Sequence, residues 1–146
     1  MSDPSTVRTD AAPPPVGAYP HARVVGDTLY CSGVGPRKAG QDDIPGVTLN
    51  AQGKVEAKDI AAQCESCFGN ARAVVEAAGF AWTDVVDVLA FLTDMEGDFA
   101  TYNEVYARWF AGEGNPNPAR TTIEISALPT PIAVEIKIVA VRQSAS

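Results

Sequence analysis

The segment from Asp59 to Gly79 has the pattern of one amphipathic helix, and this pattern constrains the fold more than any other feature. Asp59 is a suitable N-cap, and Gly79 stands where helices commonly end. A helix of this kind buries its apolar face against another layer of secondary structure. The apolar stripe consists of Ile60, Cys64, Phe68, Ala71, Val75 and Ala78.

The remaining elements predict an α+β domain with the order ββαβαββ, in which two helices cover one face of a mixed sheet. Gly26-Asp27 separates two short β-type runs and is typical of a hairpin turn. Asp98 is predicted to cap a second helix, and the region from Gly33 to about Gly53 is predicted to be a loop. The predicted strands are Ala22–Val25, Thr28–Ser32, Val85–Thr93, Thr121–Ser126 and Ala133–Val141, and the second helix presents Phe99, Tyr102, Val105, Tyr106, Trp109 and Phe110 on one face.

Each of the last two predicted strands contains a charge that its pattern does not require. Arg120 lies where a proline-ended loop enters a β-branched run, and Glu135 lies between Val134 and Ile136. An arginine can bind a carboxylate with two parallel hydrogen bonds, and a partly buried carboxylate can take a proton from water. The pair predicts a site for a small organic acid and a water molecule. The residues alone leave alternatives open, since arginine commonly forms surface ion pairs and strand carboxylates also form interface salt bridges.

One face of the predicted sheet has no helix to cover it. Val134, Ile136 and Ile138 can face the helices. The alternate residues must then face something else, and an oligomer commonly covers such a face. We therefore expect a homo-oligomer with sites where subunits meet. The alternate set is Glu135, Lys137 and Val139, together with Thr122 and Glu124 or their neighbours.

Composition limits the class of protein. The length of 146 residues is typical of one domain, which we place at residues 12–146 after a flexible leader, residues 1–11. Eleven basic and eighteen acidic residues give a net charge of −7, which argues against nucleic acid or an anionic membrane as the partner. The leader has no hydrophobic signal-peptide core, so we expect a cytoplasmic protein.

The spacing Cys64-x-x-Cys67 is shared by redox and metal motifs, but here it falls on the apolar stripe of the first helix. Buried, reduced thiols are the favoured interpretation, and a thiol-based chaperone or redox role is the alternative. A zinc site would need two more ligands, and the chain has one histidine, His21, which we expect to be solvated.

Several segments, in this order and spacing, resemble the Rid or YjgF family of reactive-intermediate deaminases from about Ala12 to Arg142. They are Ala12-Pro13, Gly17-Ala18-Tyr19, Leu29-Tyr30-Cys31-Ser32-Gly33, Asn70, Val74 to Gly79, Phe91-Leu92-Thr93-Asp94-Met95, Phe99, Asn103-Glu104-Val105-Tyr106, Pro118-Ala119-Arg120-Thr121, Leu128-Pro129 and Val134-Glu135-Ile136. The resemblance implies a chorismate-mutase-like fold and a homotrimer with three clefts between subunits. It also implies hydrolysis of imines or enamines to a keto acid and ammonia, without a metal or an organic cofactor.

The resemblance also assigns roles to individual residues. Arg120 would hold the substrate carboxylate, and Glu135 would position or activate water. Thr122 would lie beside the attacked carbon. The sequence departs from the family at Val34, where many members have glutamine. The residues that match the family's cleft are Tyr19, Ser32, Gly33 and Asn103.

Two further segments are similar to one branch of the family, the 2-aminomuconate deaminases. They are the loop Gly35-Pro36-Arg37-Lys38-Ala39-Gly40 with Ile44-Pro45-Gly46-Val47, and the run from Leu128 to Glu135. Aminomuconate carries two carboxylates, and the adjacent cations Arg37 and Lys38 would supply a second binding group. This resemblance implies conversion of 2-aminomuconate to 4-oxalocrotonate and ammonia in aromatic-compound catabolism.

Three alternatives remain open at this point. In the first, the chain is a general deaminase that clears 2-aminoacrylate-type intermediates, with Arg37 and Lys38 on a solvated loop. In the second, it is a non-enzymatic trimer that binds small acids or client proteins in the same clefts. In the third alternative, the thiols carry the function.

Overall fold

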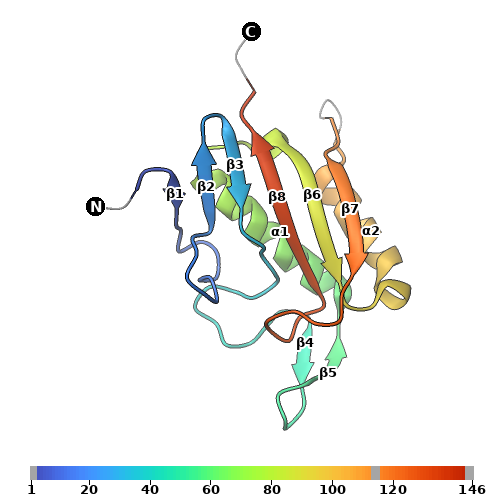
Figure 1. Ribbon diagram of the computed structural model, residues 1–146. Coiled ribbons are helices and arrows are strands. Elements are labelled where there is room, and N and C mark those ends of the chain that lie inside the picture. The colour runs from blue at the N-terminus through green and yellow to red at the C-terminus, as the bar shows by residue number, and fades with distance from the viewer. Residues whose placement is uncertain (1–2, 113–115, 144–146) are drawn as a thin grey trace.

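A six-stranded sheet carries both long helices on one face in the computed structural model, which describes residues 3–112 and 116–143 (Figure 1). The strand order is β1-β2-β3-β8-β6-β7, and only β6 and β7 are parallel neighbours. The predicted α+β class, with two helices on a mixed sheet, is therefore confirmed. The sheet strands are β1 Thr6–Val7, β2 Ala22–Val25, β3 Thr28–Cys31, β6 Val85–Leu92, β7 Ala119–Glu124 and β8 Val134–Val141.

The first long helix, α1, spans Ile60–Ala77 and has the predicted ends. The Asp59 side chain accepts a hydrogen bond from the Ala62 N–H at 3.1 Å, and Gly79 adopts a φ of 83°. A positive φ after the last turn is the conformation that favours glycine there. A short 3₁₀ helix, Trp82–Asp84, then leads into β6.

The second long helix, α2, spans Met95–Phe110 and begins one turn earlier than predicted. Its N-cap is Asp94, whose side chain accepts a hydrogen bond from the Gly97 N–H at 3.1 Å. The prediction that Asp98 caps the helix is wrong. Asp98 is buried inside the first turn, where its carboxylate is 2.6 Å from the Lys58 Nζ.

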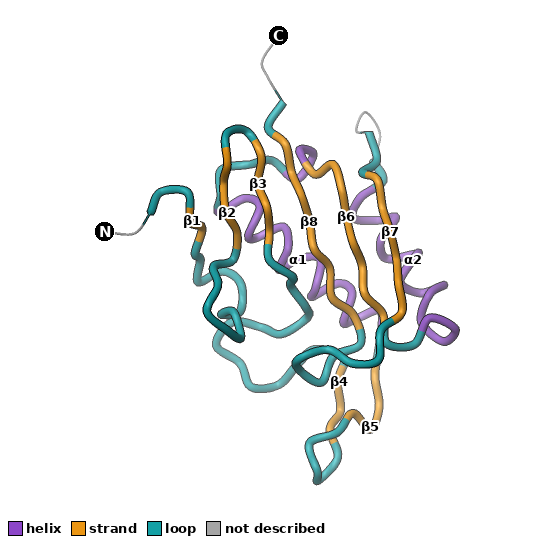
Figure 2. Tube along the Cα trace, viewed as in Figure 1, coloured by secondary structure: helices purple, strands orange, loops and turns teal. Residues whose placement is uncertain are grey.

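A small hairpin lies in the region that was expected to be a loop. Strand β4, Val47–Leu49, pairs with β5, Val55–Lys58, and the two project from the end of the main sheet (Figure 2). All four residues of β5 are exposed, so the sequence has no alternation of buried and exposed side chains there. The periodic signal of a half-buried strand is therefore missing.

The segment predicted to be a leader contributes to the sheet. Thr6 and Val7 form β1 and pair with Arg23 and Ala22 of β2. Its flexibility in solution stays a prediction. No helix in the described ranges is long and apolar enough to span a membrane.

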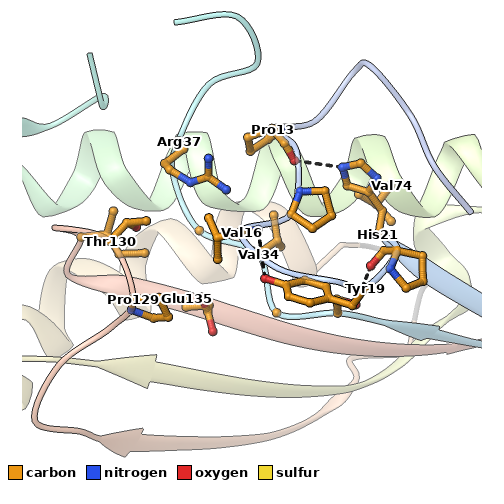
Figure 3. Close-up of a pocket in the computed structure, with 16 residues that line it drawn as sticks. Pro13, Val16, Tyr19, His21, Val34, Arg37, Val74, Pro129, Thr130 and Glu135 are labelled. Atoms are coloured by element: carbon orange, nitrogen blue, oxygen red, sulfur yellow. Dashed lines mark hydrogen bonds between the residues drawn. The ribbon is translucent and has the colours of Figure 1, made fainter. Parts of the chain in front are cut away.

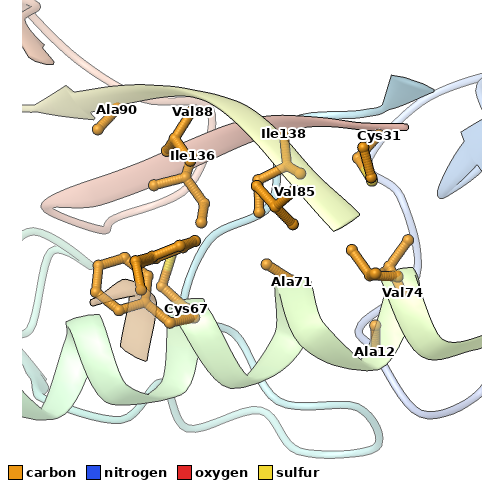
Figure 4. Close-up of a cluster of buried hydrophobic side chains, with 14 of the residues drawn as sticks. Ala12, Cys31, Cys67, Ala71, Val74, Val85, Val88, Ala90, Ile136 and Ile138 are labelled. Carbon is orange, nitrogen blue, oxygen red and sulfur yellow. The ribbon is translucent and has the colours of Figure 1, made fainter. Parts of the chain in front are cut away.

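The core fills the space between the sheet and the helices (Figure 4). Val134, Ile136 and Ile138 of β8 are fully buried on the helix side, as predicted, whereas Lys137 is exposed on the other face. That other face, which we call the open face, has no helix over it. Tyr30 and Ile123 on it are 49% and 39% exposed.

All three cysteines belong to the core, and for Cys64 and Cys67 the helical pattern predicted this. Burial raises the pKa of both Cys31 and Cys64 to about 12, and it raises the pKa of Cys67 as well. The Cys67 thiol also lies 3.3 Å from the carbonyl of Val34. Since the thiolate is the reactive species, these thiols are protected twice, by burial and by protonation.

We predict that a disulfide reagent such as DTNB does not react with the native protein at neutral pH and reacts with all three thiols after denaturation. A Cys64→Ala/Cys67→Ala variant should retain native activity. Rapid labelling of the native protein would instead support the thiol-based alternative.

Candidate functional site

Glu135 is positioned by an irregularity between β3 and β8. Tyr30 pairs with Val139, and beyond the end of β3 Val34 pairs with Ile136. Three residues, 31 to 33, therefore lie opposite two, 137 and 138, which is the arrangement of a β-bulge. A Cβ on Gly33 would lie 2.6 Å from the Glu135 Oε2. Glycine at this position lets the carboxylate lie directly against the backbone.

The Glu135 side chain lies in a cavity of about 130 Å³, which we call the Glu135 cavity (Figure 3). Three segments form its wall: residues 13–21, residues 32–37 after β3, and residues 129–132 before β8. Tyr19, Ser32, Gly33 and Arg37 all line it, so the structure brings these four predicted site residues to Glu135.

The chemistry of the cavity is set by a half-buried carboxylate. Burial raises the pKa of Glu135, and the positive charge of Arg37 opposes this effect. No side chain or backbone group in the described ranges donates a hydrogen bond to the carboxylate, and none forms an ion pair with it. A carboxylate in this state can accept a proton or a hydrogen bond from a small molecule in the cavity.

One wall of the cavity is a proline-rich segment, residues 13–20, which we call the proline arm. Three of the predicted site residues help to fix it. The Ser32 hydroxyl donates to the Pro20 carbonyl at 2.7 Å, and the Arg37 Nη2 donates to the Pro14 carbonyl at 2.8 Å. The Tyr19 hydroxyl accepts a hydrogen bond from the Val16 N–H at 3.3 Å. Ser32, Arg37 and Tyr19 therefore shape the cavity in addition to facing it.

The other predicted site residues gather at the edge of the sheet, between β7 and α2. The Arg120 Nη1 donates to the Asn103 Oδ1 at 2.8 Å, and the guanidinium lies 4.6 Å from the ring centroid of Tyr106. The Thr122 hydroxyl lies 3.0 Å from the hydroxyl of Tyr102. We call Arg120, Asn103 and Thr122 the edge group.

Arg120 does not take part in the surface ion pair that the sequence left open. In the described part of the chain, its guanidinium pairs with neither Glu124 nor Glu135. Glu124 instead accepts a hydrogen bond from the Met95 N–H at 2.8 Å.

The edge group and the Glu135 cavity lie on opposite faces of the sheet. Arg120 is paired with Val88, which is buried under the helices. Glu135 is paired with Phe91, three residues further along β6, so it points to the open face. Thr122 also points toward the helices, and its neighbours Thr121 and Ile123 face the open side. One copy of the chain therefore separates the predicted site residues into two groups, the Glu135 cavity and the edge group, which we call the two half-sites.

Two results differ from the residue-level expectations. Lys38 is exposed and lines neither half-site, although its neighbour Arg37 lines the cavity. His21, expected to be solvated, is half-buried in the cavity wall, with its Nε2 2.9 Å from the Pro13 carbonyl. The run of prolines before it was the available signal, because proline residues accept hydrogen bonds but have no N–H to donate.

Metal-binding residues do not cluster in the described ranges, where no group of three or more His, Cys, Asp or Glu side chains is arranged to hold an ion.

Comparison with known proteins extends the resemblance over nearly the whole chain. A family model described as Endoribonuclease L-PSP matches residues 9–142. A RutC family protein of Saccharolobus solfataricus is 37% identical over 132 residues, which cover 90% of this chain and 93% of that protein. The 2-iminobutanoate/2-iminopropanoate deaminase of Escherichia coli K12 is 32% identical, covering 94% of this chain and 98% of the deaminase.

Solved structures share the fold. The YjgF gene product of Escherichia coli superposes with a TM-score of 0.80 at 32% identity, covering 94% of this chain and 98% of that one. Escherichia coli TdcF with bound serine gives a TM-score of 0.81 at 30% identity, with the same coverage. The predicted chorismate-mutase-like architecture is thereby confirmed.

The raised pKa of Glu135 predicts how stability depends on pH. An acid whose pKa is higher in the folded state stabilises the fold fully below its unfolded pKa, and this contribution is lost as the pH rises through the folded pKa. Replacing Glu135 by neutral glutamine should therefore raise the Tm at about pH 7 and give no gain at about pH 3. Thermal unfolding at both pH values tests this, with exposed Glu104→Gln as the matched control. An equal gain at both values would contradict it.

Proposed function

The chain belongs to the Endoribonuclease L-PSP family, the Rid/YjgF proteins, and on this basis we propose that it is a hydrolytic deaminase of imino acids and their enamine tautomers. The observation that carries the proposal is the half-buried Glu135 carboxylate, which faces a cavity with no partner in the described part of the chain. The name of the Escherichia coli relative, 2-iminobutanoate/2-iminopropanoate deaminase, supports this substrate class. Although the family description names an endoribonuclease, the net charge of −7 weighs against RNA as a substrate.

The proposed reaction needs no organic cofactor and no metal. An enamine first tautomerises to its imine, which makes the carbon bonded to nitrogen electrophilic. Glu135 takes a proton from water as the water oxygen bonds to the carbon of the protonated imine, and it returns this proton to the nitrogen of the tetrahedral intermediate. The carbon–nitrogen bond then breaks, and the departing ammonia takes the proton of the new hydroxyl group, which leaves a keto acid and an ammonium ion. General acid–base assistance of this kind typically contributes about 10²- to 10⁴-fold in rate.

Substrate positioning is assigned to the edge group. The Arg120 guanidinium would bind the carboxylate beside the imine carbon, and the Thr122 hydroxyl would lie near that carbon. Asn103 would keep the guanidinium in place through its existing hydrogen bond. A fixed carboxylate also fixes the distance between the carbon and the attacking water, which adds to the rate.

Arg120 and Glu135 can share a substrate only if they come from different copies, because they lie on opposite faces of one sheet. We therefore propose a homotrimer in which the edge group of one copy completes the Glu135 cavity of the next. The exposed apolar side chains of the open face, such as Tyr30 and Ile123, support burial of that face in an assembly.

The finer proposal is that the substrate is the dicarboxylate 2-aminomuconate, converted to 4-oxalocrotonate and ammonia in aromatic-compound catabolism. Arg37 supports it, since a second cation in the Glu135 cavity would bind the distal carboxylate. Lys38 is exposed outside the cavity, so we assign the role to Arg37 alone. Deamination of smaller imino acids such as 2-aminoacrylate is the second candidate, and the name of the Escherichia coli deaminase favours it. Binding of small acids without turnover is the non-enzymatic alternative.

A subunit-mixing experiment tests the shared site. Arg120→Ala and Glu135→Gln should each lower deaminase activity by about 10²-fold or more. When the two inactive variants are unfolded together and refolded, random assembly places an intact Arg120 opposite an intact Glu135 in about a quarter of the sites. Ammonia release should therefore recover to about a quarter of the wild-type rate.

Two controls accompany the mixing experiment. Each variant refolded alone should stay inactive, and wild type refolded with the double variant should give about a quarter of the activity rather than a half. Failure of the mixture to recover, although mixed oligomers form, would place both residues in a site within one copy.

The ratio of activities on two substrates tests the finer proposal. Arg37→Ala should lower kcat/KM for 2-aminomuconate about 10- to 100-fold more than for 2-aminoacrylate, which corresponds to a hydrogen bond to a charged group. Lys38→Ala is the matched control and should leave the ratio unchanged. An equal loss on both substrates would assign Arg37 to the proline arm rather than to the distal carboxylate.

A further inference from the structure

His21 connects the sheet to the proline arm. Its main chain belongs to the sheet: the N–H donates to the Val7 carbonyl at 3.0 Å, and the carbonyl accepts from the Ser32 N–H at 3.0 Å. Its side chain turns toward Pro13 at the start of the arm and lies in the wall of the Glu135 cavity (Figure 3). Because the sheet fixes the backbone of His21, its ring can fix the position of the backbone groups that it contacts.

Both ring nitrogens have a partner. The Nε2 is 2.9 Å from the Pro13 carbonyl, and the Thr9 N–H points to the Nδ1 at 3.3 Å. A carbonyl only accepts a hydrogen bond, and a backbone N–H only donates one. The neutral ring with its hydrogen on Nε2 satisfies both contacts. In a protonated ring, Nδ1 would also carry a hydrogen, and this N–H would face the N–H of Thr9.

The proline arm depends on contacts of this kind. Pro13, Pro14 and Pro15 have no N–H, so these residues cannot donate to a strand ladder. Side chains hold their carbonyls instead: His21 at Pro13 and Arg37 at Pro14, with Ser32 holding the far end at Pro20. Loss of the His21 contact would release the first of these three anchors.

Charged groups share two hollows with His21. Arg37 and Glu135 line the Glu135 cavity with it, and Arg8 and Asp10 line a second surface hollow to which His21 also contributes. None of these four side chains forms a hydrogen bond with the ring in the described part of the chain. The two backbone contacts therefore define the orientation of the ring.

We propose that His21 is a positioning residue, whose neutral imidazole fixes the proline arm over the Glu135 cavity and so keeps water away from the carboxylate. The inference rests on the proposed function in naming the cavity as the active site. The part of the inference that concerns structure, namely that His21 orders the proline arm, does not depend on the reaction.

Release of the arm should change the environment of Glu135 in a defined direction. Burial is the larger of the two influences on this carboxyl and raises its pKa. Water admitted by a loose arm would lower that pKa toward the ordinary value. A general base with a lower pKa stays ionised at lower pH. The fall in activity on the acidic side of the pH–activity profile, which we call the acid limb, therefore moves to lower pH.

Hydrogen exchange tests whether His21 orders the proline arm, without an activity assay. Residues 16–19 supply the amide hydrogens of the arm, and these should exchange about 10-fold faster in His21→Ala than in wild type. His21→Gln should restore protection, because its side-chain N–H extends as far as Nε2 and reaches the Pro13 carbonyl. His21→Asn should not, because its shorter amide ends near the position of Nδ1.

Kinetics on 2-aminoacrylate complete the experiment. In His21→Ala and His21→Asn, KM should rise about 10-fold with kcat within about twofold, and the acid limb should move to lower pH. His21→Gln should match wild type in both respects. If His21→Ala does not fold, the comparison of His21→Asn with His21→Gln carries the test.

The outcomes separate the two claims. Absence of deaminase activity in wild type, with arm exchange still controlled by His21, would overturn the proposed function and leave His21 as the anchor of the arm. Unchanged exchange at residues 16–19 in both His21→Ala and His21→Asn would overturn the His21 proposal, whatever the activity. Equal loss of kcat in all three variants with an unmoved acid limb would also overturn it.

Discussion

The contact between the Glu135 carboxylate and the Gly33 backbone determines the rest of the site. It exists because a bulge brings residues 31 to 33 opposite two residues of β8, and because glycine leaves room for the carboxylate. The buried side chains of Val134 and Ile136 flank Glu135 and fix its strand against the helices. The acid is therefore held by the apolar core on one face of β8 and presented to the cavity on the other.

An ionised carboxylate without a partner destabilises a folded chain, and the proline arm increases this effect by reducing access of water. Three hydrogen bonds to the carbonyls of Pro13, Pro14 and Pro20 offset the cost of ordering the arm. Proline also reduces the conformational freedom that is lost when the segment is ordered. A segment unable to join a strand ladder is thus suited to forming a wall whose position depends on side chains around the cavity.

Much of this arrangement could be predicted from the sequence, and the remainder depends on contacts between distant segments. The stripe of α1 and its ends at Asp59 and Gly79 were predictable because capping and periodicity are local properties. The start of α2 was misassigned because Asp94 and Asp98 are both acceptable caps. In the structure Lys58, 40 residues before Asp98, lies 2.6 Å from the Asp98 carboxylate and 3.5 Å from that of Asp94, and Asp94 is the one that accepts the Gly97 N–H.

The site shows the same division between local and distant information. Arg120 and Glu135 stood out as charges in apolar strands, yet their separation onto two faces follows from strand register, which local pattern does not specify. His21 was expected to be solvated because it lies in the first predicted hairpin, next to Pro20. Its partner at Pro13 is placed there by the path of the proline arm.

The charges of the two half-sites bear on how a chain of net charge −7 could bind the anionic substrate proposed above. Lys58, Arg72 and Arg108 form ion pairs with carboxylates. In the described part of the chain, Arg37 and Arg120 are held by neutral groups instead, the Pro14 carbonyl and the Asn103 amide. The ring of Tyr106 also positions Arg120 without cancelling its charge. Neutral partners fix each guanidinium and leave its charge available to a ligand, so each half-site presents one cation that no carboxylate neutralises through an ion pair in the described residues.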